Sequence, residues 1–176
     1  MEEIAFPKIE VLETLMVSSI RNVFTTMLSK NLLFKARYGR DKAGIKPFYS
    51  LGSKDPLVVG SIGFVGEANG VVYIYMHQAV AYQIASAMTG MGVDELASEF
   101  EIVKDVVGEV SNMTIGGFKN GICDLGFNCR VTLPTVLRGS QMEVDSVQSA
   151  RRDTFHFEFD GQPIVMDLFI QENRNQ

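Results

Sequence analysis

The sequence predicts a single α+β domain in which long helices are packed on a largely antiparallel sheet. Two segments, Ile9–Lys30 and the stretch after Asp94, carry apolar side chains at helical spacing. Elsewhere, β-branched and aromatic runs flank Asn-Gly and Asp-Gly pairs, which favour the tight turns of antiparallel hairpins. At 176 residues the chain is long enough to bury a sizeable core, so residues 1–176 are taken as one domain.

Apolar side chains that recur every three or four residues predict the helices. The first helix has Pro7 near its start, where the missing N–H is tolerated. In the longest helix Asp94 is the expected N-cap, and a glycine is expected to end it. The predicted helices are Ile9–Lys30, Gln78–Met88, which closes near Gly90 and Gly92, and Asp94 to about Gly116 or Gly121.

Runs of β-branched and aromatic residues between turn signals predict the strands. Asn69-Gly70 and Asp160-Gly161 are the expected hairpin turns. Parts of Leu32–Pro56 are candidates for strand, but glycine and proline indicate that most of Arg37–Lys46 is loop. The polar tail, about residues 171–176, is expected to be frayed. The predicted strands are Val58–Val65, Val71–Met76, Phe127–Leu133, Thr154–Phe159 and Pro163–Ile170.

Composition and charge exclude several classes of protein. Hydrophobic residues make up 46% and charged residues 21% of the chain, as in ordinary globular domains. No apolar run approaches the roughly 20 residues of a membrane-spanning helix, and the acidic N-terminus lacks a secretion signal, so a cytoplasmic protein is expected. The net charge of −5 argues against nucleic acid as a partner, because phosphate binding needs a clustered positive surface. The one basic doublet, Arg151-Arg152, is interpreted as a solvated turn.

The most informative feature is a polar stripe on the predicted long helix. Asp105, Glu109 and Asn112 recur at i, i+4 and i+7, so their side chains project from one side of the helix. Glu101 and Gly116 fall on the same stripe, and valines occupy the opposite side. From periodicity alone, a solvated helix face is the ordinary explanation of such a pattern.

Two features of the polar stripe favour a function. Gly108 and Gly116 lie on or beside it, although each glycine costs about 1 kcal/mol relative to alanine in a helix interior. Glycine leaves the helix surface low and accessible to a docking partner. No lysine or arginine stands four residues after Asp105 or Glu109, so the acids are available to a partner's cation.

The motif Asp105-x-x-x-Glu109-x-x-Asn112, followed by Gly116-Gly117, resembles the signature of the CheC/CheX/FliY family of chemotaxis phosphatases. The order of elements is also similar to that family, with a strand pair and a short helix before the motif and a hairpin at the end. A single copy of the motif is similar to CheX rather than to CheC, which carries two copies. The resemblance covers roughly Ile9 to Phe169.

The resemblance implies a CheC-like fold and a phosphatase that accelerates the dephosphorylation of a phosphorylated CheY-like response regulator in chemotaxis signalling. Asn112 would orient the attacking water, because an amide donates and accepts hydrogen bonds without adding charge beside a phosphate. Glu109 would pair with the regulator's active-site lysine. No covalent intermediate would form on this protein. The other residues expected at the partner surface are Asp105, Glu101, Gly108 and Gly116.

No cofactor or metal site of its own is implied by the resemblance, and Mg²⁺ is expected on the response regulator. The alternative hypothesis is a non-catalytic CheX-like module that docks a receiver domain or a flagellar-switch component. The intact Glu109 and Asn112 pair favours the enzyme, because a docking module has no need of an amide that orients water.

The family's two intertwined, similar halves imply a pseudo-twofold internal duplication. Ser19-Ile-Arg-Asn22 echoes Glu109-Val-Ser-Asn112, but serine replaces the charged glutamate, so this first copy is interpreted as structural. The resemblance also implies a homodimer formed through a sheet edge, either the last hairpin or the strand pair between residues 57 and 77. An exposed edge of this length needs protection or a partner.

Competing chemistries are poorly supported. Cys123 and Arg130 are one residue too far apart for the loop of a cysteine-dependent phosphatase, and Cys123 and Cys129 are interpreted as reduced thiols, most simply small buried side chains. His77 and His156 lack neighbouring ligands at zinc spacing, and His156 is expected to be exposed on the polar side of a strand. No Gly-x-x-x-x-Gly-Lys-Ser/Thr phosphate loop is present.

Overall fold

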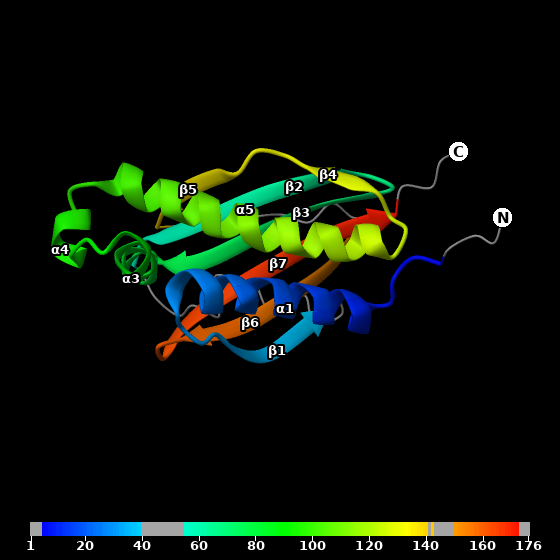
Figure 1. The fold of residues 1–176 in the computed structure, drawn as a ribbon, viewed down its shortest axis with the longest axis horizontal. Coiled ribbons are helices and arrows are strands. Elements are labelled where there is room, and N and C mark those ends of the chain that lie inside the picture. The colour runs from blue at the N-terminus through cyan, green and yellow to red at the C-terminus, as the bar shows by residue number, and fades with distance from the viewer. Residues whose placement is uncertain (1–4, 40–54, 141, 143–149, 173–176) are drawn as a thin grey trace.

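An antiparallel sheet carries the two long helices side by side on one of its faces (Figure 1). The computed structural model describes residues 5–39, 55–140, 142 and 150–172. Within this part of the chain, no helix is both long enough and apolar enough to cross a membrane. In chain order the elements are α1 (Ile9–Leu28), β1 (Leu33–Gly39), β2 (Leu57–Gly66), β3 (Ala68–His77), α3 (Gln78–Thr89), α4 (Val93–Leu96), α5 (Phe100–Asp124), β4 (Cys129–Val131), β5 (Thr135–Gly139), β6 (Arg151–Phe159) and β7 (Gln162–Glu172).

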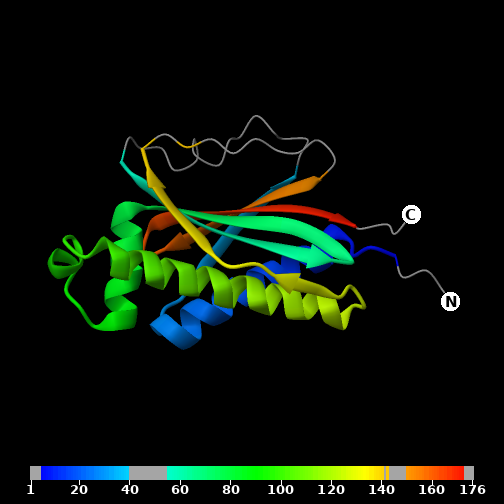
Figure 2. The same ribbon diagram turned by 90° about the horizontal axis from the view of Figure 1, so that it is seen from above.

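Within the described residues, seven strands form one sheet in the order β1-β6-β7-β3-β2, with β4 and β5 both paired to the far side of β2. All of these pairings are antiparallel. Figure 2, which turns the molecule by a quarter, shows α1 and α5 on the same side of the sheet. Ile164, Met166 and Leu168 of β7 are buried in the core beneath the helices. The α+β class predicted from the sequence is therefore confirmed.

The topology repeats itself across the central pair β3 and β7. The first half contributes α1, β1, β2 and β3, and the second contributes α5, β5, β6 and β7 in the same order. Exchanging the two halves maps the strand order β1-β6-β7-β3-β2-β5 onto itself in reverse. Each half pairs its first strand with the other half, because β1 pairs with β6 and β5 pairs with β2. This arrangement is the intertwined duplication that the resemblance implied.

Glycines let α5 approach two of its neighbours, β2 and α1, closely. A Cβ added at Gly60 of β2 would overlap the hydroxyl of Ser111 on α5. A Cβ added at Gly121 of α5 would likewise overlap the side chain of Leu15 on α1. These contacts lie on the side of α5 opposite to the polar stripe, and they hold that side against β2 and α1. The stripe is consequently turned outward.

The echo of the motif lies on α1, where it takes part in helix packing. A Cβ added at Gly117 of α5 would lie 3.1 Å from Ser19 Oγ, so Ser19 faces the neighbouring helix. Asn22, by contrast, is exposed. The position that corresponds to Glu109 thus serves the contact between α1 and α5, which agrees with the structural role predicted for this copy.

The hairpin between β2 and β3 turns earlier than the sequence predicted. Glu67 alone separates the two strands, whereas Asn69 and Gly70 belong to β3. Asn69 Oδ1 accepts a hydrogen bond from the backbone N–H of Gly66 at 3.0 Å. A side chain at Gly70 would overlap the ring of Phe64, its partner across the strands. Glycine is needed here for close packing and not for a turn.

The last hairpin forms at the predicted position. Asp160 and Gly161 join β6 to β7 with φ angles of 47° and 77°. Positive φ at both central residues matches the twist of the flanking strands. Strand β7 continues to Glu172, so the first two residues of the expected frayed tail belong to the sheet. Residues 173–176 lie outside the described part.

Three other boundaries were predicted wrongly. Asp94 lies within α4, and α5 begins at Phe100 after the N-cap residue Glu99. Helix α5 runs on to Asp124, past the glycines proposed as its end, because those glycines lie in its interior and Gly121 packs against α1. Residues 37–39, predicted as loop, belong to β1, while residues 40–46 lie outside the described part.

The basic doublet lies in a strand and not in a solvated turn. Arg152 of β6 binds the fully buried Asp167 of β7 through two nitrogens, with Nη2 2.7 Å from Oδ2 and Nε 3.0 Å from Oδ1. Thr154 Oγ1 donates a further hydrogen bond to Oδ1 at 3.0 Å. Burial raises the pKa of Asp167 above its ordinary value, and the contacts with Arg152 oppose that rise.

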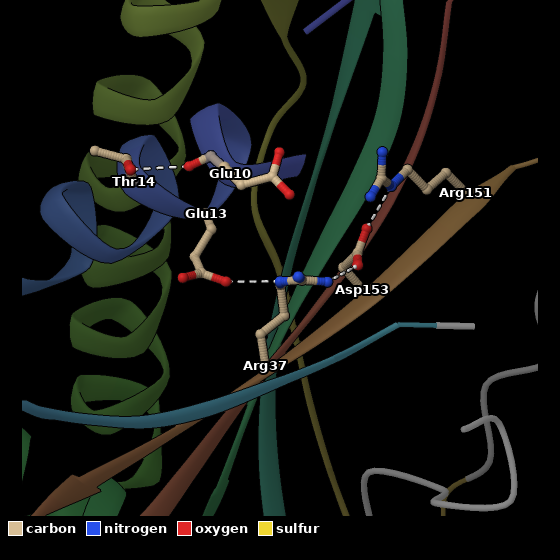
Figure 3. A network of polar contacts seen from close by, with 6 residues as sticks. All are labelled: Glu10, Glu13, Thr14, Arg37, Arg151 and Asp153. Carbon is tan, nitrogen blue, oxygen red and sulfur yellow. Dashed lines mark hydrogen bonds and ion pairs between the residues drawn. The ribbon is translucent and has the colours of Figure 1, made fainter. Parts of the chain in front are cut away.

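Arg151 points to the helix-covered face and joins a second ionic network (Figure 3). Asp153 is 1% exposed and accepts hydrogen bonds from Arg151 Nε at 2.7 Å and from Arg37 Nη1 at 2.9 Å. Arg37 Nε also donates to Glu13 of α1 at 2.6 Å. The network ties α1, β1 and β6 together at the edge of the sheet opposite to β5.

His156 is half-buried, so its predicted exposure was wrong. Its ring meets the ring of Tyr38 of β1 edge to face, with centroids 4.8 Å apart. Pairing of β1 with β6 covers this position, and the resulting burial lowers the pKa of His156. The thiols behave as predicted, since Cys129 is buried, Cys123 is half-buried and both are free.

Candidate functional site

An open groove of about 380 Å³ runs between α5 and the edge strand β5. Its helix side includes the two acids at the centre of the polar stripe. Its strand side is formed by a segment much later in the chain, which β2 holds in place. The groove is lined by Lys104, Asp105, Gly108, Glu109, Pro134, Thr135 and Val136.

Glu109 and Asn112 lie about one turn apart on the outward side of α5. Glu109 is exposed and Asn112 is half-buried. Within the described part of the chain, neither side chain makes a hydrogen bond or an ion pair. An unpaired carboxylate and an unpaired amide on one rigid helix can both turn to the same partner.

The structure separates the two other acids of the stripe. Asp105 is exposed and lines the groove beside Glu109. Glu101 lies outside the groove, and its carboxylate accepts a hydrogen bond from Lys104 Nζ. This bond, together with the charge of Asp105, raises the pKa of Lys104. Asp105 and Glu109 are thus brought together in the groove, whereas Glu101 is engaged in an ion pair on the helix surface.

The two glycines of the stripe are not required by packing. A Cβ at Gly108 would lie 3.7 Å from Val136 Cγ2 and 3.9 Å from Pro134 Cγ, which are ordinary contacts. A Cβ at Gly116 would meet nothing within 4 Å. The absence of a side chain at Gly108 therefore keeps the groove open, and Gly116 leaves the helix surface bare.

The opposite wall of the groove is β5, which the sequence analysis did not predict. Val136 pairs with Gly60 and Arg138 with Val58, so both side chains face the helices. The guanidinium carbon of Arg138 lies 4.2 Å from the centroid of the Phe100 ring at the start of α5. This cation–π contact links the wall to the helix that carries the acids.

Strand β5 is absent from the prediction because the predicted strand Phe127–Leu133 was taken to end at Pro134. The chain in fact pairs with β2 twice, first through β4 and again through β5 after the proline. A proline directly before an edge strand removes no hydrogen bond from the sheet. The β-branched pair Thr135-Val136 was the signal that could have identified the wall.

The buried thiol of Cys129, which follows α5, does not provide a nucleophile. Burial raises the pKa of the Cys129 thiol to about 11, so almost no thiolate is present at neutral pH. Across residues 5–39, 55–140, 142 and 150–172, no group of three or more His, Cys, Asp or Glu side chains could hold a metal ion. The carboxylates of Asp105 and Glu109 in the groove can bind a cation. The amide of Asn112, one turn after Glu109 and outside the lining of the groove, can bind a water.

A model of the protein family described as "Chemotaxis phosphatase CheX" matches residues 58–158. That stretch contains all of α5 and both walls of the groove. No curated protein sequence matches this chain.

Several solved structures share the fold. CheX from Vibrio vulnificus is 24% identical, with a TM-score of 0.73 over 91% of this chain and 99% of that chain. A chemotaxis protein CheX from Desulfovibrio desulfuricans is 20% identical, with the same TM-score and the same coverage. The CheX–CheY–BeF₃–Mg²⁺ complex from Borrelia burgdorferi is 24% identical, with a TM-score of 0.68 over 97% of this chain and 100% of that chain.

Proposed function

Because the chain belongs to the CheX family of chemotaxis phosphatases, we propose that it accelerates the dephosphorylation of a phosphorylated CheY-like response regulator. The observation that carries the proposal is the pair of unpaired side chains, Glu109 and Asn112, beside the open groove. The structure of CheX with CheY, BeF₃ and Mg²⁺ from Borrelia burgdorferi supports a receiver domain as the partner, since that CheX has the same fold.

In this proposal, Glu109 fixes the position of the bound regulator relative to α5. Its carboxylate is exposed and has no cation of its own, so it binds the active-site lysine of the regulator by a charge-assisted hydrogen bond. Lys104 also lines the groove, but its ammonium pairs with Glu101 and not with Glu109. Asp105 stands in the groove beside Glu109 and adds negative charge that attracts the same lysine.

Asn112 acts on the water. Hydrolysis of an acyl phosphate needs a water in line with the phosphorus, and the developing charge is stabilised mainly by groups of the regulator itself. The amide of Asn112 can accept a hydrogen bond from that water and donate another, which fixes its orientation without adding charge. Half-burial on α5 limits the freedom of the side chain, so less entropy is lost when the water is positioned.

The phosphorus is attacked by water and the regulator's aspartate leaves, so no covalent intermediate forms on this chain. No metal or cofactor held by this chain takes part, and the Mg²⁺ belongs to the substrate. Gly108 and Gly116 leave room for the regulator to approach α5. Placement in the cytoplasm, where response regulators work, belongs to the same proposal.

The test is release of phosphate from CheY-like receivers of the same genome, phosphorylated with a small donor, with and without this protein. We expect acceleration at amounts of protein well below those of the receiver. Glu109→Ala is expected to weaken both binding and acceleration, because it removes the contact with the lysine.

Binding of a beryllofluoride-loaded receiver without acceleration of dephosphorylation would refute the phosphatase function and favour the alternative, a non-catalytic docking module. Neither binding nor acceleration with any such receiver would refute both.

A further inference from the structure

The connection between β4 and β5 presents a leucine to solvent at the rim of the groove. Leu133 is 88% exposed, more than any other large apolar side chain in the described part of the chain. It directly precedes Pro134, which lines the groove next to Gly108. The leucine therefore stands beside the stretch of α5 that carries Glu109 and Asn112.

The backbone on both sides of Leu133 is fixed to β2. The N–H of Thr132 donates to the carbonyl of Gly63 at 2.8 Å, and Thr132 Oγ1 accepts from the N–H of Gly63 at 3.0 Å. Two residues after Leu133, Thr135 pairs with Ser61 in the sheet. An exposed side chain on a held backbone loses little entropy when it binds, so it is suited to anchor a partner.

Leu133 belongs to an apolar border that follows the polar stripe. Val131 pairs with Phe64 and Val136 with Gly60, so both face the side of the sheet that α5 covers. Val131 remains 37% exposed. A protein that covers Glu109 and Asn112 must lie over or against this border. The border consists of Val131, Leu133, Pro134 and Val136.

We propose that Leu133 is a specificity-determining anchor that inserts into an apolar depression on the phosphorylated receiver domain, beside its active-site lysine. The inference rests on the proposed function and assigns a second contact to the same docking surface. The acids of the groove select a cation, and Leu133 selects an apolar pocket at a fixed distance from that cation. A receiver with the lysine but without the pocket binds poorly.

This division assigns affinity to Leu133 and rate to Asn112. Leu133 touches no reacting atom, so its contact is the same in the ground state and the transition state. Loss of such uniform binding raises KM and leaves kcat unchanged. A residue that merely stabilised the fold would instead alter the melting temperature.

The experiment compares Leu133→Ala and Leu133→Asp with wild type in titrations of a beryllofluoride-loaded receiver and in steady-state phosphatase assays. Leu125→Ala is the matched control, because Leu125 is also exposed, at 40%, and follows the far end of α5. Burial of a leucine side chain predicts a rise of about tenfold in Kd and KM for Leu133→Ala. Leu133→Asp is expected to have a larger effect, because it places a charge in an apolar pocket. Leu125→Ala is expected to match wild type.

If wild type accelerates dephosphorylation but Leu133→Ala has the same Kd and KM as Leu125→Ala, the role of Leu133 as an anchor is refuted, and the proposed phosphatase function is still supported. If Leu133→Asp changes the molecular mass in light scattering and leaves Kd and KM unaltered, a second copy of this chain is the occupant and the anchor is also refuted. If wild type accelerates no receiver, the proposed function fails and the anchor fails with it.

Discussion

Gly60 of β2 and Ser111 of α5 lie in such close contact that no side chain fits between them. Ser111 is 1% exposed, and its hydroxyl donates a hydrogen bond to the carbonyl of Val107 one turn earlier. The contact fixes the rotation of α5 about its own axis. Asn112, the next residue along, is thereby turned away from the sheet. The outward position of Glu109 and Asn112 on α5 thus depends on a glycine in a neighbouring strand.

Gly60→Ala is expected to destabilise the fold by about 1–3 kcal/mol, because the added methyl group overpacks the junction of α5 and β2. Denaturant unfolding followed by circular dichroism measures the change. Adding Ser111→Ala removes the hydroxyl that the methyl would strike and should restore part of the stability. A single variant as stable as wild type would mean that the junction can relax.

Gly108→Ala is expected to keep or raise stability, by up to about 1 kcal/mol, because alanine is the better helix former and its Cβ makes only ordinary contacts. Gly108→Met is expected to fill the groove and reduce the acceleration of dephosphorylation without unfolding the protein. Melting temperature and phosphate release are measured for both. Full activity of Gly108→Met would show that the partner does not enter the groove.

Arg152→Ala is expected to cost about 3–5 kcal/mol, because it leaves the carboxylate of the fully buried Asp167 without its cation. The double variant Arg152→Met/Asp167→Leu removes both charges and should recover most of the loss. Urea titrations of the three proteins test this. Equal loss in the single and double variants would contradict the assignment of the cost to an unpaired charge.

Acidification is expected to destabilise the protein partly through His156. Burial lowers its pKa, so the unfolded chain takes up the proton more readily than the native state. The contribution of neutral His156 to the free energy of unfolding is fully present above the ordinary histidine pKa of about 6.5, and it is lost as pH falls below that value. The drop in melting temperature between pH 7.5 and 5.5, roughly one unit either side of that pKa, should be smaller for His156→Gln than for wild type. An identical drop would rule out this contribution.

Periodicity sufficed for the elements that carry one clear pattern. The apolar spacing in Ile9–Lys30 predicted the first helix, which ends two residues earlier, at Leu28. The Asp160-Gly161 pair predicted the last hairpin turn where it forms. Patterns that depend on contacts between residues far apart in the sequence led to wrong predictions. Gly70 accommodates the ring of Phe64, and Gly121 accommodates Leu15, so neither glycine marks a turn or a helix end.

The candidate site was half predictable. Asp105, Glu109 and Gly108 follow from the spacing on one helix, and all of them line the groove. The wall Pro134–Val136 depends on the pairing of β5 with β2. The β-branched pair Thr135-Val136 indicates a strand, but it does not indicate which strand it pairs with. The ion pair of Lys104 with Glu101 was overlooked because only i+4 partners of Asp105 and Glu109 were considered. The homodimer remains a prediction, but the edges expected to form it were wrong. Within the described residues, both strands of the last hairpin and both strands of the 57–77 pair have neighbours on each side, and the edges of the sheet are β1 on one side and β4 and β5 on the other.

In the proposed mechanism, Asn112 contributes to the rate of dephosphorylation and not to the affinity for the receiver. Asn112→Ala is therefore compared with Asn120→Ala, which removes an exposed amide of the same helix two turns further on. Both proteins are titrated with a beryllofluoride-loaded receiver and assayed for phosphate release from the phosphorylated receiver. We expect Asn112→Ala to bind like wild type but to lose roughly 10²-fold or more of the acceleration, while Asn120→Ala keeps both binding and acceleration. Acceleration by Asn112→Ala at the level of Asn120→Ala would contradict this mechanism.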